Sequence, residues 1–224
     1  MSLLHEYGPL FLHGLALTLA LAAVSWVLAF TVGLTLALLR MTKVKLLEWV
    51  VIAFVEYQRN VPPLVHIFLW YFGVSSMLAQ GLQDWANAHH GEFYFSALAI
   101  GLYYGAYVAE DIRSGLRSIP NGQLEAARAL GLGYFGAMRR VVLPQALRVA
   151  VAPLVSGAVM LVKTTSLAMM LGVMELTYVT KDVASKTFKI FESYGISTAL
   201  YVAVALALLF LGSWLSRRFR IKDR

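Results

Sequence analysis

An uninterrupted stretch from Gly8 to Leu39 contains no aspartate, glutamate, lysine or arginine. About 20 apolar helical residues cross the hydrocarbon core of a bilayer, so this stretch predicts one long or tilted transmembrane helix. The composition agrees, because 59% of the 224 residues are hydrophobic and only 14% are charged, a far more apolar balance than that of soluble domains. We therefore expect an all-α integral membrane protein.

Four later segments bring the expected number of transmembrane helices to about five, in a single domain over residues 1–224 with its core at about 10–218. They are Leu46 to Gln80, Phe93 to Ala109, Gln145 to Val162 and Ser193 to Ser216. The second segment is interrupted by Pro62 and Pro63, which remove two backbone donors. Either its helix breaks at membrane depth, or its first part lies in the interface. Residues 163–193 give no clear assignment, and Asp84, His89, His90 and Glu92 indicate a polar loop.

Basic residues set the expected orientation. With the N-terminus outside and the C-terminus in the cytoplasm, most of the 19 lysines and arginines fall on the cytoplasmic side, as the positive-inside rule favours. The net charge of +7 therefore reports membrane orientation and contact with lipid, and we expect no nucleic-acid partner.

The cytoplasmic loop at about 118–144 carries a short helix between backbone breakers. Pro120 and Gly122 open it, Glu125 lies in its first turn, and Gly131 is suited to end it. Ala126 and Ala127 make the helix thin, so another protein surface could approach it closely.

This loop resembles the signature loop of ATP-binding cassette (ABC) importer permease subunits, through Glu125-Ala126-Ala127, Gly131 and Leu143-Pro144 at the spacing of that family. Arg59-Asn60-Val61-Pro62 and Lys163-Thr164-Thr165-Ser166 also match, and the resemblance extends over about residues 10–220. The chain looks most similar to polar amino acid permeases, and closest to those for glutamate and aspartate. It departs from many relatives at Thr164, where they carry Asp or Asn, and at the second proline, Pro63.

The resemblance implies a type I ABC importer transmembrane domain in the bacterial inner membrane. Two permease subunits, identical or homologous, would sit on cytoplasmic ABC ATPase subunits, and an extracytoplasmic amino-acid-binding protein would deliver the substrate. Glu125, Ala126, Ala127 and Gly131 would form the coupling helix held by the ATPase. The chain would bind no cofactor itself, and ATP would be used by the partner.

Catalytic motifs give no competing interpretation. The sequence has no GxxxxGK[ST] phosphate loop, HExxH or GxSxG, and its five histidines form no metal-ligand pattern. We therefore expect neither an enzyme nor a metal site. A small ion-gradient-driven transporter or channel remains the alternative, and a membrane scaffold that transports nothing is a weaker one.

Polar groups near the expected spans are the candidate substrate contacts, because unpaired charge is costly there and marks functional sites. They are Arg59, Asn60, Lys163, Thr164, Thr165 and Ser166. If these two cations instead have a purely structural role, Arg59 pairs with Glu56, and Lys163 pairs with Glu175 or a lipid headgroup. We expect Glu110 and Asp111 to be interfacial anchors or intrasubunit partners. Tyr103, Tyr104 and Tyr107 favour packing, with a translocation path as the alternative.

Overall fold

The computed structural model describes residues 3–42 and 44–218, and within these ranges the chain is helical and contains no strand. The elements are, in order, α1 (Leu3–Met41), α2 (Lys45–Asn60), α3 (Pro63–Phe68), η1 (Leu69–Val74), α4 (Gln80–Ala88), α5 (Gly91–Arg117), α6 (Asn121–Ala129), α7 (Tyr134–Ala137), η2 (Met138–Val142), α8 (Leu143–Thr164), η3 (Thr165–Leu171), α9 (Leu176–Thr187) and α10 (Ile190–Arg218). The expected all-α fold is confirmed.

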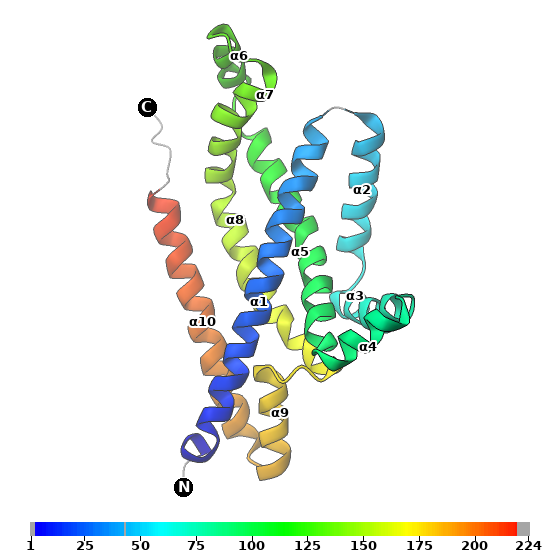
Figure 1. Ribbon diagram of the computed structural model, residues 1–224. Coiled ribbons are helices and arrows are strands. Elements are labelled where there is room, and N and C mark those ends of the chain that lie inside the picture. Colours follow the sequence, from blue (N-terminus) through cyan, green and yellow to red (C-terminus); the bar gives the residue numbers. More distant parts are fainter. Residues whose placement is uncertain (1–2, 43, 219–224) are drawn as a thin grey trace.

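The helices form an elongated bundle whose two ends differ (Figure 1). The start of α1 and α9 lie at one end, whereas α6 and α7 lie at the other, toward which α10 runs. The lysines of α9 are thus separated from the arginines around α6 along the length of the bundle, as the charge distribution predicts.

Among the described residues, three helical segments are long and apolar enough to cross a membrane: α1, the continuous segment Tyr134–Leu171, and α10. Large apolar side chains on these helices remain exposed, among them Leu12 at 62%, Val27 at 66% and Phe210 at 70%. Extended apolar surface of this kind suits contact with lipid. α5 is also long enough, but its tyrosines and glycines lower its hydropathy, and it packs against α1, α2, α3 and α8. The five-span count therefore stays a prediction.

Glycines allow α1 and α5 to pack closely. A Cβ atom at Gly33 would lie 2.5 Å from Cγ1 of Val108 and 2.8 Å from the carbonyl oxygen of Gly105. Small residues at such positions let helix backbones approach each other in membranes. The α1–α5 pair therefore forms the centre of the bundle and fixes the position of the polar face of α5.

The helix of the second segment breaks at the double proline. α2 ends at Asn60, Val61 is extended with φ −103° and ψ 134°, and α3 begins at Pro63. A residue before proline is pushed out of the helical region, which explains the break. The expected polar loop is partly wrong, because Asp84 lies within α4, whereas His89 and His90 follow it.

The fourth span begins earlier than expected. α7, the π-helical turn η2 and α8 run together without a break, so Pro144 lies inside a continuous helical segment. The wider turn over Met138–Val142 precedes the proline and is the kind of local adjustment that accommodates its missing donor.

Glu175 joins three elements in the segment that the sequence left unassigned. Its side chain is fully buried and accepts hydrogen bonds from the backbone N–H groups of Thr177 at 2.9 Å and Tyr178 at 2.8 Å, which caps α9. The Tyr201 hydroxyl on α10 donates to it at 3.0 Å, and Thr18 on α1 lies 3.4 Å away. This carboxylate thus links α1, α9 and α10.

Candidate functional site

Three tyrosines form a cluster on α5. Tyr103 and Tyr107 are one helical turn apart, and their hydroxyl oxygens lie 3.1 Å from each other. The ring centroid of Tyr104 lies 5.2 Å from that of Tyr103 and 5.9 Å from that of Tyr107. The cluster therefore offers several hydroxyl groups on an aromatic surface.

A cavity of about 460 Å³ lies beside this cluster, between α5 and α8. It is lined by Tyr103, Tyr104, Tyr107, Asp111, Pro153, Ser156, Gly157 and Met160. Its size falls within the range of small-molecule sites, and its lining combines apolar side chains with a few polar groups, as ligand sites do.

Arg59 reaches the tyrosine cluster from the end of α2. Its guanidinium carbon lies 5.2 Å from the ring centroid of Tyr107, a cation–π arrangement. The expected alternative pairing with Glu56 is wrong, because the Asn60 amide donates to the Glu56 carboxylate at 3.0 Å and to its backbone oxygen at 2.7 Å. In the described part of the chain the Arg59 guanidinium forms no ion pair with a carboxylate within 4.0 Å, whereas Asn60 is engaged locally.

Thr164 reaches the same cluster from the end of α8. Its hydroxyl oxygen lies 2.7 Å from that of Tyr104 and 3.0 Å from the carbonyl oxygen of Met160. Since the single threonine proton goes to the carbonyl, Tyr104 is the donor in the first bond. The structure thus brings Arg59 and Thr164, far apart in sequence, to one group of tyrosines.

The other residues of the Lys163–Ser166 motif are exposed or bond locally. The Thr165 hydroxyl is buried and donates to the Val162 carbonyl at 2.7 Å, and Ser166 donates to the Lys163 carbonyl at 2.7 Å. Lys163 is exposed and forms no ion pair with any described residue. Its expected alternative pairing with Glu175 is wrong, because that carboxylate is occupied at the start of α9.

Glu110 and Asp111 have different surroundings. Glu110 accepts from Arg40 at 2.7 Å and also binds Arg113, so its expected role as an intrasubunit partner is confirmed. Asp111 lines the tyrosine cavity instead. The sequence did not single out Asp111 for this role, although it follows Tyr107 by one helical turn and so shares its face.

His66 also adjoins the cluster. It is buried on α3 between Tyr57 and Tyr103, with ring-centroid distances of 5.1 Å and 5.8 Å. Neither ring nitrogen has a hydrogen-bond partner among the described residues. The histidine therefore packs the helix that follows the double proline against α5.

The loop helix α6 has the expected form. It runs from Asn121 to Ala129 and ends where Gly131 takes φ +87°. The N–H of Gly131 donates to the Arg128 carbonyl at 2.9 Å, and the N–H of Leu132 to the Ala127 carbonyl at 3.2 Å, which together make a Schellman motif. The predicted helix end at Gly131 is confirmed.

The surface of α6 is largely open. Glu125, Ala126 and Gly131 are exposed, whereas Ala127 is buried on the side of α6 that packs against α7 and η2. Leu130 is 86% exposed at the end of the helix, a feature that the sequence pattern did not predict. α6 lies at the tip of the bundle in Figure 1. Its exposed Leu130 side chain and Glu125 carboxylate are available to a partner.

Comparisons with known proteins agree with this arrangement. A family model described as "Binding-protein-dependent transport system inner membrane component" matches residues 29–221. The probable glutamine ABC transporter permease protein GlnM of Bacillus subtilis is 30% identical over 218 residues, covering 97% of this chain and 97% of its own. The glutamate/aspartate import permease protein GltJ of Escherichia coli K12 is 31% identical over 212 residues, covering 93% and 86%.

A solved structure also has the same fold. The crystal structure of an amino acid ABC transporter with histidines contains a chain that is 32% identical, with a TM-score of 0.82 and 96% of each chain covered. The similarity therefore extends over the tyrosine cluster, the double-proline break and α6 together.

Proposed function

Because this chain belongs to the family of binding-protein-dependent transport system inner membrane components, we propose that it is the permease subunit of an ATP-driven amino-acid importer. Its relatives named above are permeases for glutamine and for glutamate and aspartate, which supports amino acids as the substrate class. An importer driven by ATP does not need an ion gradient, so membership of this family disfavours the ion-gradient-driven alternative.

The observation that carries the proposal is the tyrosine cavity between α5 and α8. It combines a carboxylate from Asp111, hydroxyls from the tyrosine cluster and a nearby guanidinium from Arg59. An amino acid presents an ammonium and a carboxylate on neighbouring atoms, so both of its charges would find an opposite charge here. Unpaired ionisable groups within spans are themselves a mark of substrate pathways.

The preference within amino acids is a finer part of the proposal. Arg59 supplies a cation and Asp111 an anion beside the tyrosine cluster, and the exposed Lys163, which precedes Thr164 in the chain, would supply a second cation. Glutamate and aspartate carry two carboxylates and one ammonium, which complement this set, whereas a neutral amino acid leaves one cation unmatched. We therefore favour acidic substrates over neutral polar ones.

Energy would come from partner subunits. α6 presents Glu125, Ala126 and Leu130 at the tip of the bundle, where a cytoplasmic ATPase would hold it. A second permease subunit, identical or homologous, would complete the path, and an extracytoplasmic binding protein would deliver the substrate. ATP-driven closure of the ATPase dimer would then move α6 and rock the helices between outward and inward states.

The chain would lie in the bacterial inner membrane with its N-terminus outside. The support is the separation of α9 from the arginine-rich end that carries α6, together with the positive-inside rule.

Purification of the tagged chain in gentle detergent from its native membrane tests the assembly. We expect an ABC ATPase to co-purify in stoichiometric amount, and the complex in liposomes to take up labelled glutamate only with ATP and the binding protein. Uptake that resists vanadate and collapses with an ionophore would instead establish ion-gradient transport.

A further inference from the structure

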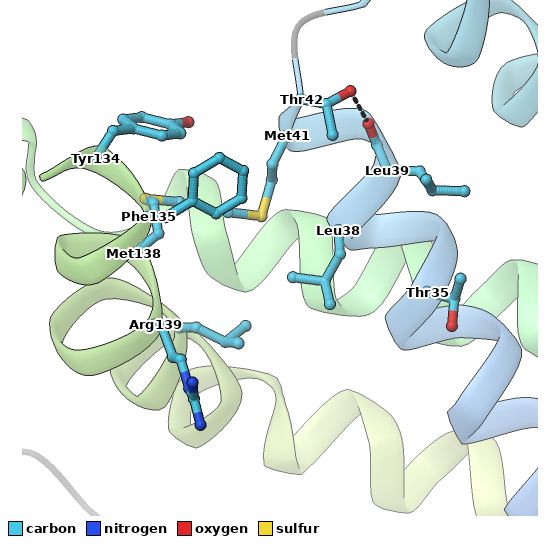
Figure 2. A pocket seen from close by; sticks show the side chains of 10 residues that line it. Thr35, Leu38, Leu39, Met41, Thr42, Tyr134, Phe135, Met138 and Arg139 are labelled. Atoms are coloured by element: carbon cyan, nitrogen blue, oxygen red, sulfur yellow. Dashed lines mark hydrogen bonds between the residues drawn. The ribbon is translucent and has the colours of Figure 1, made fainter.

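A second cavity, of about 480 Å³, lies where the end of α1 meets α7 and η2. Figure 2 shows Phe135, Met41 and Leu38 directed toward a common space, with Met138 beside them. Phe135 is 80% exposed, and Leu38 is 39% exposed. The cavity is therefore an open, apolar surface at one end of two membrane helices.

One cation borders this apolar surface. Arg139 lines the cavity and is exposed, and its side chain has no hydrogen bond or ion pair with any residue in the described ranges. A ligand that suits the site must therefore be apolar along most of its length and carry an anionic group at one end. Anionic phospholipids have this chemistry, and negatively charged membrane surfaces attract basic side chains next to transmembrane helices.

The position of the cavity favours lipid over a protein partner. Among the described residues that line it, those from α1 and those from the α7–η2 segment belong to the ends of two spans, and none belongs to α6. We expect the ATPase to contact α6. This cavity instead lies at the depth where the lipid headgroups would be. Arg40, which follows the uncharged stretch of α1, marks that level.

We propose that this cavity binds an anionic phospholipid of the adjacent leaflet, with an acyl chain against Leu38, Met41 and Met138 and the phosphate on Arg139. The site requires that this end of the bundle lie at a membrane surface, which follows from the proposed function. The bound lipid fixes the segment between α6 and α8 to the end of α1, so the lipid composition bears directly on the segment that would transmit ATPase movement.

Photolabelling tests the site without reference to transport. The full complex is placed in nanodiscs that contain either phosphatidylglycerol or phosphatidylcholine bearing a photoreactive acyl chain, and labelled peptides are mapped by mass spectrometry. We expect labelling of the α1 end and of the Tyr134–Val142 segment, with phosphatidylglycerol preferred. Replacing Arg139 by glutamine should lower that preference about fivefold, the order expected for one charge at an anionic surface.

Arg140 gives the matched control, because it is an exposed neighbouring arginine that does not line the cavity. Arg140→Gln should leave the labelling unchanged, whereas Leu38→Trp, which fills the apolar space, should lower labelling by both lipids. Equal labelling by the two lipids, or equal effects of Arg139→Gln and Arg140→Gln, would overturn the proposal. So would an absence of labelling in the full complex that is restored when the ATPase is removed, which would assign the surface to that partner. Because labelling does not depend on uptake, a failure here is distinct from a failure of the importer proposal.

Discussion

The hydroxyl oxygens of Tyr104 and Thr164 lie 2.7 Å apart and join α5 to the end of α8 at the edge of the tyrosine cavity. Tyr104→Phe removes the donor and leaves the Thr164 bond to Met160 in place. We expect the maximal rate of amino-acid uptake to fall about fivefold, because a net hydrogen bond contributes about 1 kcal/mol to holding the two helices together. Uptake into proteoliposomes with saturating binding protein measures this.

Thr164→Val should have a similar effect, and the double variant should lose little more than either single one, since both remove the same bond. Tyr94→Phe is the control, because Tyr94 is 52% exposed and does not line the cavity. Additive losses in the double variant would mean that the two hydroxyls act separately.

Asp111 and Lys163 should affect selectivity differently. If Asp111 receives the α-ammonium group, Asp111→Asn weakens uptake of acidic and neutral amino acids alike, by about tenfold in the apparent KM, the scale of a charge-assisted hydrogen bond. Lys163→Met should weaken glutamate uptake more than glutamine uptake, because only the acidic side chain needs the second cation. Competition between labelled glutamate and unlabelled glutamine measures the ratio.

A loss confined to glutamate in Asp111→Asn would contradict the assignment to the ammonium group. An equal loss of both substrates in Lys163→Met would contradict the acidic preference while leaving amino-acid transport intact. Lys181→Met, on the end of the bundle that carries α9, serves as the control for loss of a lysine elsewhere.

Local sequence patterns predicted most of the fold correctly. The uncharged stretch before Arg40 and the apolar segment before Arg217 appear as α1 and α10. The break at Pro62 follows directly from proline geometry. Each of these features is determined by residues that are close together along the chain, so the sequence alone is enough to predict it.

Contacts between distant segments were harder to predict. The sequence suggested Glu56 and Glu175 as partners for the two candidate cations, because distance along the chain was the only available guide. In the structure Glu175 meets Thr18 and Tyr201, which come from opposite ends of the chain. The role of Asp111 in the cavity was not predicted for a different reason. Asp111 and its neighbour Glu110 are both carboxylates, and they differ in the face of α5 that they occupy. Glu110 is paired with Arg40, whereas Asp111 lines the cavity.

Glu175 should be essential for stability. Glu175→Ala removes the cap of α9 and leaves the partly buried Tyr201 hydroxyl and two backbone N–H groups without this acceptor. We expect a loss of about 3 kcal/mol in the free energy of unfolding, from the cap and the unsatisfied groups together. Thermal unfolding of the detergent-solubilised protein measures the change.

Glu192→Ala is the matched control. The Glu192 carboxylate lies 3.6 Å from the Lys189 amine and is 55% exposed, so its loss should cost less than about 1 kcal/mol. Equal destabilisation by the two variants would show that the buried carboxylate does not hold α1, α9 and α10 together.

Gly131 should be needed for coupling and not for insertion. Its φ of +87° suits glycine, and its N–H donates to the Arg128 carbonyl, so Gly131→Pro loses both the backbone conformation and the donor. Gly131→Ala adds a Cβ into open space, so it should suffer only backbone strain of about 1 kcal/mol and lose part of the activity.

We expect Gly131→Pro to abolish uptake and the stimulation of ATP hydrolysis by loaded binding protein, with an unchanged amount of protein in the membrane. Gly122→Ala, in the first turn of α6 with open space around it, should retain activity. Normal transport by Gly131→Pro would remove the assignment of α6 as the coupling helix.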